Sequence, residues 1–533
     1  TSLREKALEQ IDDNVRWIPA WASNRIGSMV EERPDWCISR QRYWGVPIPV
    51  FKCKSCGEIV ANEESFDAVI ELFRTKGADA WYTTAPEDYL PSSVCCPNCG
   101  SHDLEPEKDV LDVWWESGVS HTSVCEARPY LHRPADVYLE GSDQHRGWFQ
   151  SSLLTSVGAY DEAPFKTVVS CGFTVDENGR KMSKSLGNGI DPLEMAEKYG
   201  ADALRFNLIT GNSPGNDTRF YTEKCEAMRN FANKIWNASR FVMMNLTIDK
   251  CELPAADALA PEDKWVLSKL NTLVKEVTEN LDAYEIGVAS AKVYDFLWDT
   301  YCDWYIELTK TRLQGEDEGA KLAAQNVLCF VLTELLKLLH PFMPFITEEI
   351  YQALPHEEQF IMTSRWPEYR ADLTFPEEEA AMEAVMDTIK AIRARRAEMN
   401  VPPSRKAEVL IVTATPDVYA QGRHFIQRLA YASEVKFADA APADVSGMVT
   451  AVTHNATAYL PLSELVDIAA ELERIRKEIE KAQNGLRGVE QKLSNEKFVS
   501  RAPEAVVNAE REKAAKYKEL IAKLEESAKA MQA

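Results

Sequence analysis

Apolar residues recur every three or four positions through much of the second half of the chain. Between residue 207 and about 385 this spacing predicts long helices that pack as a bundle. From residue 465 the intervals alternate between three and four over four heptads, and a second apolar face follows an interruption at 498–503. The tail is therefore predicted to form an antiparallel helical hairpin. Its apolar positions are Leu465, Ile468, Leu472, Ile475, Ile479, Ala482, Leu486, Val489 and Leu493, then Ala514, Tyr517, Ile521 and Leu524.

Short apolar runs bounded by glycine-rich turns predict strands elsewhere. Residues 135–139 predict a buried strand, followed by a polar glycine turn and a helix that begins at Trp148. Residues 167–169 predict a second strand ahead of another glycine-rich loop, and 407–412 a strand of a small α/β module. Because ligands collect outside the carboxyl ends of strands in α/β sheets, the first two loops are candidate sites.

Composition narrows the classes of protein. The 533 residues are 45% hydrophobic and 27% charged, which is typical of a globular chain with several domains. A net charge of -24 argues against binding nucleic acid through the whole surface, so any RNA contact needs a local basic face. No apolar run approaches the roughly 20 residues of a membrane span, and no apolar leader opens the chain. We therefore predict a cytoplasmic protein without a membrane partner.

Four of the twelve cysteines form two Cys-x-x-Cys-Gly knuckles separated by residues 57–95. Four thiolates at this spacing suit tetrahedral Zn²⁺, and four cysteine ligands leave no open position for catalysis. The alternative is a pair of reduced turns without metal. Cys95 adjoins the second knuckle and is the spare thiol. The predicted ligands are Cys53, Cys56, Cys96 and Cys99.

Residues 179–188 combine lysines, serines and glycines directly after a predicted strand. Charge and glycine content alone fit either a phosphate-binding loop or a solvated turn. The order Lys181-Met182-Ser183-Lys184-Ser185, however, resembles the signature loop of class I aminoacyl-tRNA synthetases. This resemblance implies that Lys184 steadies the phosphates of ATP, bound with Mg²⁺, and that Lys181 assists. It also implies that Ser183 and Ser185 contribute to the ATP site.

Residues 109–118 and 135–149 resemble the amino-acid and adenylate site of the isoleucyl enzymes of this class. By this resemblance Glu140 and Gly141 contact the adenylate, and Asp143 and Gln144 contact its sugar or the α-amino group. Trp148 lines the side-chain pocket. Without the resemblance, Asp143 is equally well interpreted as a helix cap, and the neighbouring histidine as a satisfied surface residue.

The sequence departs from the family pattern at two positions that relatives use to bind the nucleotide. Cys171 stands where relatives usually have a histidine, and a thiol is a poor substitute for an imidazole donor. The family's His-x-Gly-His turn occurs nowhere in the 533 residues. We therefore expect only the second half of a catalytic domain, in a C-terminal fragment that does not activate an amino acid alone.

The resemblance also predicts the domain organisation. Residues 35–49 resemble the point where the chain returns from an inserted editing domain. The fold class is an α/β, Rossmann-like catalytic half-domain with a zinc insertion, then a helical anticodon-binding bundle and a C-terminal antiparallel coiled coil. The predicted parts are the end of the editing insertion (1–33), the catalytic half-domain (34–206, zinc insertion about 51–104), the anticodon-binding domain (207–385), a small α/β module (386–462) and a coiled-coil arm (463–533).

Two regions are expected to meet tRNA. The densest basic patch contains Arg393, Arg395 and Arg396, which could reach tRNA phosphates. The tail resembles the arm of valyl enzymes that leans on the tRNA elbow, and its 14 basic and 13 acidic residues from 465 to 531 relieve the negative charge of the chain. Periodicity alone fits a dimer seam equally well. The resemblance favours an intramolecular arm and a monomer.

The predicted function is ATP-dependent attachment of a branched aliphatic amino acid to tRNA. The residues up to about 185 resemble the isoleucyl enzymes, and those after it resemble the valyl enzymes. Two explanations fit this change: a divergent natural enzyme, or two sequences joined by recombination or assembly near the signature loop. A methyl group is worth only about 1–3 kcal/mol in an apolar pocket, so either enzyme needs editing. Valine with tRNA(Val) is the first prediction, isoleucine with tRNA(Ile) the alternative, and a non-catalytic tRNA-binding protein the second alternative.

Overall fold

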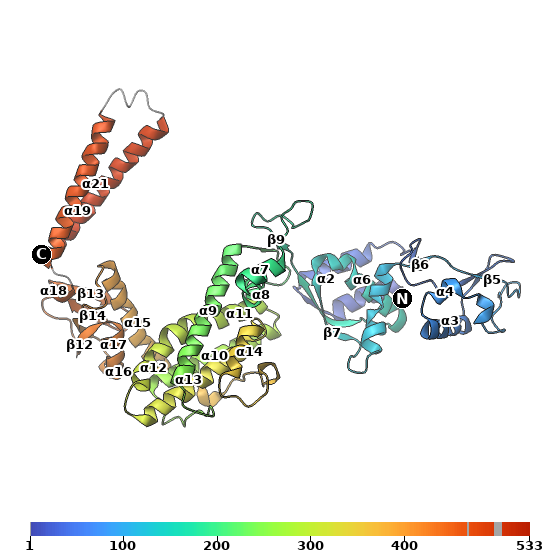
Figure 1. Cartoon of the computed structure of the whole chain (residues 1–533), viewed down its shortest axis with the longest axis horizontal. Helices are drawn as coiled ribbons and strands as arrows, with labels where there is room; N and C mark the ends of the chain where they lie inside the picture. The colour runs from blue at the N-terminus through green and yellow to red at the C-terminus, as the bar shows by residue number, and fades with distance from the viewer. Residues whose placement is uncertain (1, 466–467, 495–503, 533) are drawn as a thin grey trace. The chain divides into compact units, whose positions relative to one another are not determined.

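The structure, a computed structural model, describes residues 2–465, 468–494 and 504–532. These residues belong to two compact units, Thr1–Ala232 with Val277–Lys292 and Asn233–Glu276 with Val293–Ala533 (Figure 1). Three helices contribute residues to both units: α9 (Thr222–Asn245), α10 (Pro261–Asp282) and α11 (Ile286–Asp295).

A parallel three-stranded sheet forms the centre of the first unit, in the order β1 (Arg16–Ile18), β8 (Phe165–Cys171), β7 (Ala135–Gly141). Helix α6 (Trp148–Tyr160) connects β7 to β8, which confirms the predicted strand, turn and helix. Four consecutive residues of β8, 167–170, are buried because parallel strands are covered on both faces. The expected Rossmann-like sheet is present.

The first thirty residues belong to this sheet and its core. They form α1 (Leu3–Glu9), η1 (Gln10–Asn14), β1 and α2 (Trp21–Glu31). Trp17 of β1 packs with residues of α2 and α6 in one hydrophobic cluster, and its indole N–H donates to the Ile11 carbonyl at 2.9 Å. The boundary expected at residue 33 is therefore no structural division. Descent of these residues from an editing insertion stays a prediction.

The insertion that is predicted to bind zinc has a small core of its own. Strand β3 (Phe51–Cys53) lies between β4 (Ile59–Val60) and β5 (Leu104–Pro106), and Phe51 packs against Trp81 with ring centroids 5.1 Å apart. Antiparallel pairing of β2 (Ser39–Arg40) with β6 (Val110–Leu111) brings together the segments on either side of the insertion. The other elements of the insertion are α3 (Glu63–Lys76), α4 (Ala80–Thr83) and η2 (Pro86–Asp88).

The first unit also contains short elements that lie before β7 or after it in the sequence. Strands β9 and β10 pair in parallel on either side of the signature loop's sequence. The elements are α5 (Val113–Gly118), η3 (His121–Glu126), η4 (Ser142–Arg146), β9 (Thr174–Val175), α7 (Pro192–Tyr199), α8 (Ala201–Ile209) and β10 (Thr218–Arg219).

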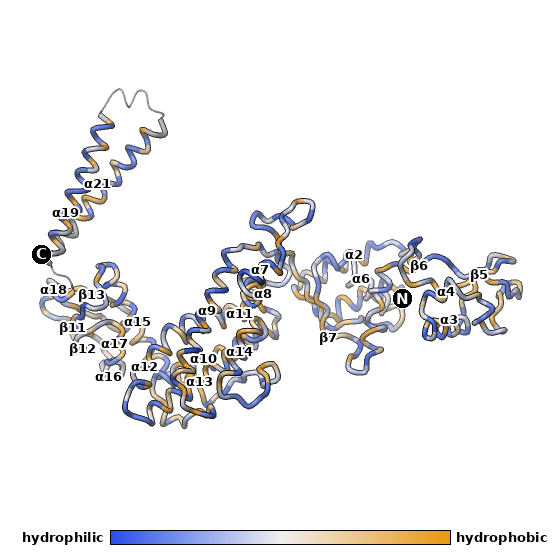
Figure 2. The backbone as a smooth tube through the Cα atoms, viewed as in Figure 1, coloured by the Kyte–Doolittle hydropathy of each residue, from blue (hydrophilic) through white to orange (hydrophobic). Residues whose placement is uncertain are grey.

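Long helices form most of the second unit, as predicted from the spacing. Helix α13 (Glu318–Leu339) belongs to its core, because most of its residues are buried, and hydrophobic residues predominate along it (Figure 2). By length and composition α13 could cross a membrane, but 72% of that window is buried inside the fold, as expected for a core helix. The other helices are η5 (Phe296–Tyr305), α12 (Ile306–Leu313), α14 (Pro344–Gln352), η6 (Ile361–Thr363), η7 (Ala371–Leu373) and α15 (Pro376–Glu398).

The predicted small α/β module contains a four-stranded sheet in the order β12 (Ala432–Ala438), β11 (Ala407–Val412), β14 (Thr457–Pro461), β13 (Met448–Val452). Helices α16 (Pro416–Gln421) and α17 (Arg423–Leu429) lie between β11 and β12 in sequence. The boundary expected at residue 385 falls inside α15. It is misplaced because Val385 packs on Gly422, where a Cβ would lie 2.7 Å from the Val385 side chain.

The tail forms the predicted pair of helices. Helices α19 (Ile468–Leu493) and α21 (Glu504–Gln532) follow the short α18 (Leu462–Leu465), and hydrophobic and hydrophilic turns alternate along both (Figure 2). They run antiparallel, because Lys492 pairs with Glu510 at 3.7 Å, whereas Gly485, seven residues earlier, lies against the ring of Tyr517, seven residues after Glu510. The interruption expected at 498–503 lies outside the described residues.

Candidate active site

The carboxyl ends of β7 and β8 lie side by side, as expected for a ligand site. Glu140 pairs with Ser170, and Gly141 pairs with Cys171. The Glu140 carboxylate accepts a hydrogen bond from the Gly141 N–H at 2.9 Å, and Glu140 is exposed to solvent. This edge therefore has an exposed carboxylate, and beside it a glycine backbone that a ligand can approach closely, at the position predicted for the adenylate.

The turn after β7 places two further predicted residues on this edge. A Cβ on Gly141 would lie 2.7 Å from the Asp143 carboxylate, so glycine is what permits that approach. Gln144 donates to Asp143 at 3.2 Å and accepts from the Trp148 N–H at 3.0 Å. Gln144 rather than Asp143 thus satisfies the first turn of α6, which leaves Asp143 exposed and available to a ligand.

Trp148 is held rigidly beside these groups. Its ring is stacked on Tyr138 with centroids 4.0 Å apart, and its indole N–H donates to the Ser117 carbonyl at 3.0 Å and to Ser120 Oγ at 3.1 Å. The ring is only partly exposed. An indole with its polar group satisfied is a suitable apolar wall for a small side chain.

Trp114 is a candidate pocket residue that the sequence reasoning did not assign. A Cβ on Gly147 would lie 2.7 Å from the Trp114 ring, so this ring lies directly over the turn that carries Gln144. Its own N–H donates to Asp112, the N-cap of α5, at 3.1 Å. The available signal was a tryptophan two residues after a capping aspartate, inside a run already matched to the amino-acid site.

Behind this edge lie a buried imidazole and a partly buried thiol. His145 is fully buried and contacts the Ser142 carbonyl at 2.7 Å and Ser170 Oγ at 3.4 Å, so its interpretation as a surface residue is wrong. Burial lowers the pKa of His145, which keeps the ring neutral. Burial, together with the Glu140 charge, raises the pKa of the Cys171 thiol. Cys171 is consequently an uncharged group at the end of β8.

The signature loop is organised around the buried carboxylate of Asp176. This carboxylate accepts from the Asn188 amide at 3.0 Å and from the Arg180 N–H at 2.8 Å. These two hydrogen bonds lower the pKa of Asp176 to about 2, although burial opposes the shift. Asn188 in turn accepts from the Ser183 N–H at 3.0 Å. A fixed carboxylate therefore sets the path of the loop.

The predicted ATP-binding groups extend outward from this support. Lys181, Lys184 and Ser185 are exposed, and Ser183 contacts Ser185 through their hydroxyls at 3.1 Å. In the part of the chain that the structure describes, neither lysine forms an ion pair. The Lys181 ammonium lies 4.9 Å from the ring centroid of Phe173, and that ring reaches within 4.0 Å of a Cβ built on Gly141. The loop and the β7 edge thus belong to one site.

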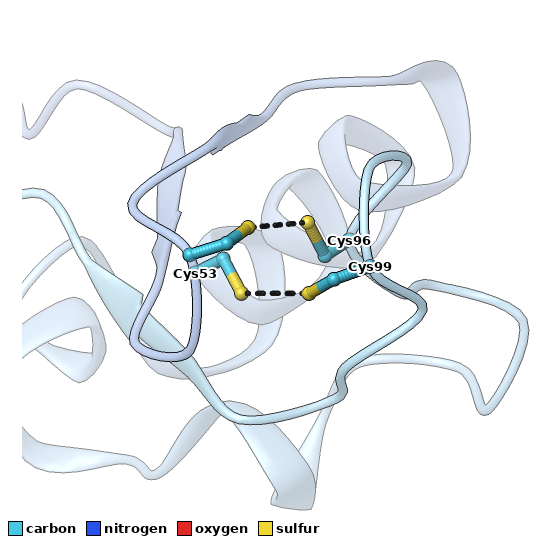
Figure 3. A group of neighbouring side chains, drawn as sticks. Cys53, Cys96 and Cys99 are labelled. Carbon is cyan, nitrogen blue, oxygen red and sulfur yellow. Dashed lines mark hydrogen bonds between the residues drawn. The ribbon is translucent and has the colours of Figure 1, made fainter.

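The four predicted metal ligands meet at one point. Their sulfur atoms lie within 4.8 Å of one another, with Cys53 to Cys99 at 3.6 Å and Cys56 to Cys96 at 3.4 Å (Figure 3). A tetrahedral Zn²⁺ with Zn–S bonds of about 2.3 Å separates its ligands by about 3.8 Å, so the cluster has the right size. The two knuckles have the same backbone turn: the Gly57 N–H donates to the Cys53 carbonyl and the Gly100 N–H donates to the Cys96 carbonyl, each at 2.8 Å.

The electrostatics of this cluster also favour a cation. Burial opposes ionisation, but backbone hydrogen bonds lower the pKa of Cys53 to about 6. At Cys99 a backbone hydrogen bond from Ser101 lowers the pKa, but the neighbouring sulfurs outweigh it and raise the pKa of Cys99 to about 12. Protein groups thus stabilise one thiolate and disfavour a further one, and a divalent cation would allow all four.

The three predicted tRNA-contacting arginines differ in accessibility. Arg393 is exposed, and Arg395 is exposed while pairing with Glu398 at 2.8 Å. Arg396 is only 3% exposed and donates to the Pro402 carbonyl at 3.1 Å. The prediction for Arg396 is therefore wrong: its guanidinium closes the turn after α15 and is not available to a phosphate.

Three protein families match successive parts of the chain. They are "tRNA synthetases class I (I, L, M and V)" over residues 1–221, "Anticodon-binding domain of tRNA ligase" over 263–411 and "Valyl tRNA synthetase tRNA binding arm" over 467–532. The chain belongs to the class I aminoacyl-tRNA synthetases.

Relatives within this synthetase class are valine-tRNA ligases. The Clostridium acetobutylicum enzyme is 44% identical over 98% of this chain and 58% of its own length. The Clostridium perfringens enzyme is 44% identical over 100% of this chain and 58% of its own length, and the Bacillus subtilis enzyme is 38% identical over 96% and 55%. The chain thus spans little more than half the length of these synthetases.

The valine relatives align on both sides of the signature loop. Resemblance to the synthetase class is confirmed, as are the catalytic, anticodon-binding and arm regions. The isoleucyl-like character of the residues before the loop stays a prediction.

Proposed function

We propose that this protein attaches valine to tRNA in an ATP-dependent reaction. The observation that carries the proposal is 44% identity to valine-tRNA ligases across nearly the whole chain, together with the match of residues 467–532 to the valyl arm. Both the catalytic region and the tRNA-binding region therefore point to the same amino acid.

The roles of the residues follow from their positions. Lys184 and Lys181 neutralise the charge that develops on the phosphates of Mg²⁺-bound ATP as the valine carboxylate attacks the α-phosphate and pyrophosphate leaves. Ser183 and Ser185 hold the loop near the nucleotide. At the sheet edge, Glu140 and Gly141 contact the resulting adenylate. Asp143 and Gln144 bind its sugar or the α-amino group, while Trp148 and Trp114 form walls of the side-chain pocket.

The described residues supply half of such a site. In the described part of the chain no strand pairs with the outer edge of β7, and Val137 and Leu139 of that strand are 41% and 57% exposed. An apolar edge of a parallel sheet is normally covered by another strand. Together with the missing His-x-Gly-His turn, this supports the proposal that activation of valine needs a further nucleotide-binding half, as the greater length of the relatives indicates.

We propose a structural Zn²⁺ on Cys53, Cys56, Cys96 and Cys99, which would fix the insertion and leave catalysis to the sheet edge. For α19 and α21 we propose an antiparallel coiled-coil arm in a monomer, with Arg393 and Arg395 as further RNA contacts. The proposed location is the cytoplasm.

Isoleucine is the second candidate amino acid, because the runs around Trp114 and Glu140 resemble the isoleucyl site. A tRNA-binding protein without catalysis is the third candidate, since half of the nucleotide site is missing from these residues.

A comparison of tRNA(Val) with tRNA(Ile) transcripts, at two salt concentrations, tests the proposal. Preference for tRNA(Val) with a clear salt slope supports it, and preference for tRNA(Ile) replaces valine by isoleucine. Valine-dependent exchange between ATP and pyrophosphate is measured in parallel. Robust exchange by this chain alone would overturn the proposal that activation of valine needs a further nucleotide-binding half. Equal, weak binding to both transcripts would overturn the valine assignment.

A further inference from the structure

A second group of cysteines meets in the helical part of the second unit. Cys251 lies in the segment that joins α9 to α10, and Cys329 lies in the middle of α13. The two thiols share a hydrogen bond. Both residues are far in sequence from the metal cluster and the candidate active site, which belong to the first unit. The proposed function therefore leaves this pair of thiols without a role.

The segment around Cys251 is fixed on α13 by polar contacts on both of its sides. Thr247 donates from its N–H and from its hydroxyl to Gln325 Oε1, at 3.1 and 3.0 Å. The Glu252 N–H donates to Asn326 Oδ1 at 2.8 Å. Gln325 and Asn326 are both buried. The segment is thus held against one face of α13 by contacts that do not involve the thiols.

These contacts bring Cys251 to the turn of α13 that carries Cys329. The Cys251 sulfur lies 3.6 Å from the Asn326 carbonyl oxygen. Residues three apart lie on the same face of an α-helix, so Cys329 projects from α13 beside Asn326. Thiols in hydrogen-bond contact need to approach by no more than about 2 Å to reach the S–S bond length of about 2.05 Å. The fold therefore holds the two sulfurs close to the separation of a disulfide.

The two thiols differ in accessibility and share one proton readily. Cys329 is fully buried, whereas Cys251 is partly exposed. The hydrogen bond with Cys251 lowers the pKa of Cys329, although burial opposes this shift. The same hydrogen bond, together with burial, raises the pKa of Cys251. The pair thus loses a first proton more easily than a second, and the remaining proton can pass between the sulfurs along their hydrogen bond.

From this arrangement we propose that Cys251 and Cys329 form a site of reversible oxidation, at which hydrogen peroxide joins them in a disulfide. Cys251 is the sulfur that meets the peroxide, because it is the accessible one. Cys329 is the resolving thiol, which is already in place beside it. A sulfenic acid next to a second thiol condenses to a disulfide, so the proximity of the two sulfurs determines the product.

The reaction balances in two steps. In the first, the Cys251 thiolate attacks one oxygen of the peroxide; an S–O bond forms, the O–O bond breaks, and the released hydroxide takes a proton from solvent to give water. In the second, the Cys329 sulfur attacks the Cys251 sulfur; an S–S bond forms, the S–O bond breaks, and the hydroxide leaves as water with the Cys329 proton. The thiols lose two electrons, and the peroxide gains them.

The disulfide closes a loop over residues 252–328. A long closed loop restricts the unfolded chain, so oxidation should stabilise the helical bundle. In a reducing cytoplasm, the proposed location, small thiols return such a pair to the reduced form by exchange. The site is therefore reduced at rest and oxidised during exposure to peroxide. This inference does not rest on the proposed aminoacylation.

The test exposes the folded 533-residue chain to hydrogen peroxide, blocks the remaining thiols with N-ethylmaleimide and digests the protein with trypsin. Cys251 and Cys329 fall in the tryptic peptides 251–264 and 322–337, each with one cysteine. A linked pair of these peptides, two hydrogens lighter than their sum, should come from most of the chains within about an hour and disappear with dithiothreitol. The melting temperature of the oxidised second unit should rise by about 5–10 °C.

Cys302→Ser is the matched control, because Cys302 is a partly exposed cysteine of the same unit in a third tryptic peptide, 293–310. It should form the link between Cys251 and Cys329 as the unsubstituted chain does. Cys251→Ser should abolish both the link and the rise in melting temperature. Without peroxide its melting temperature should match that of the unsubstituted chain, because the contacts of Thr247 and Glu252 remain.

Three results would overturn the proposal. The first is absence of the link from the folded chain after peroxide treatment, with Cys251 oxidised to a sulfonic acid or left unmodified. The second is a link between Cys251 and Cys302 of equal yield. The third is a link to Cys329 that forms only after the chain is unfolded in urea, since the native contact would then have no part in it. Because the assay needs neither tRNA nor ATP, any of these failures leaves the proposed function unaffected.

Discussion

Asp112 is expected to be the most sensitive position near the candidate amino-acid pocket. It is 4% exposed and accepts hydrogen bonds from the Trp36 indole N–H at 3.0 Å and the Trp114 N–H at 3.1 Å. It also forms an ion pair with Arg40 at 2.5 Å. One carboxylate therefore caps α5, holds Trp114 over the pocket, and joins residues 36–40 to residues 110–118.

The cost of Asp112→Ala can be worked from these contacts. Loss of the N-cap costs about 1 kcal/mol, and an indole N–H left without an acceptor about 1 kcal/mol more. The ion pair contributes about 1 kcal/mol, less than a fully buried pair, because Arg40 is 38% exposed and keeps its hydrogen bond to the Cys37 carbonyl. The sum of about 3 kcal/mol corresponds to a roughly 150-fold larger opening constant for these segments.

Hydrogen exchange followed by mass spectrometry measures this local opening directly. Peptides covering residues 36–40 and 110–118 should exchange about a hundredfold faster in Asp112→Ala. Asp109→Ala is the matched control, because Asp109 belongs to the same run and its side chain has no ion pair among the described residues. Asp112→Asn, which keeps the cap and the indole acceptor, should cost about 1 kcal/mol. Equal exchange in the Asp112→Ala and Asp109→Ala proteins would refute the reasoning.

Other parts of the chain give three further predictions. The purified chain should hold one equivalent of zinc by elemental analysis. Cys99→Ser should lose the zinc and Cys95→Ser should keep it. Absence of zinc from the unsubstituted chain, or zinc in the unsubstituted chain and both variants, would contradict the assignment. Because the folded pKa of Asp176 is lowered from 3.8 to about 2, its stabilisation of the signature loop is fully present above about pH 4 and lost as the pH falls through about 2. Asp176→Asn should therefore speed proteolytic cleavage at residues 179–188 at neutral pH, while Glu177→Gln should not. Arg396→Gln should lower the melting temperature of the chain, whereas Arg393→Gln should leave it unchanged and reduce the salt slope of tRNA binding by about 1.

Patterns that depend on neighbours in sequence were predicted well. The strand, turn and helix around Gly141 and the knuckles at Cys53 and Cys96 are local, because a few residues determine each backbone path. The hairpin of α19 and α21 follows from a periodic seam that needs only one partner. In each case the sequence specifies both the element and the face that must be buried.

Predictions that depend on contacts between distant residues were less successful. Arg396 resembles its neighbour Arg393 in every local respect, yet the turn after α15 buries it, because its backbone carbonyl partners come from residues 402 and 405. Trp17 belongs to the catalytic sheet only because β1 pairs with β8, some 150 residues away in sequence. Trp114 was overlooked for the same reason: its importance comes from Gly147, which leaves room for the ring. Charge and spacing identify which residues can perform chemistry, whereas long-range packing selects the ones that are accessible, and this selection separates Arg393 from Arg396.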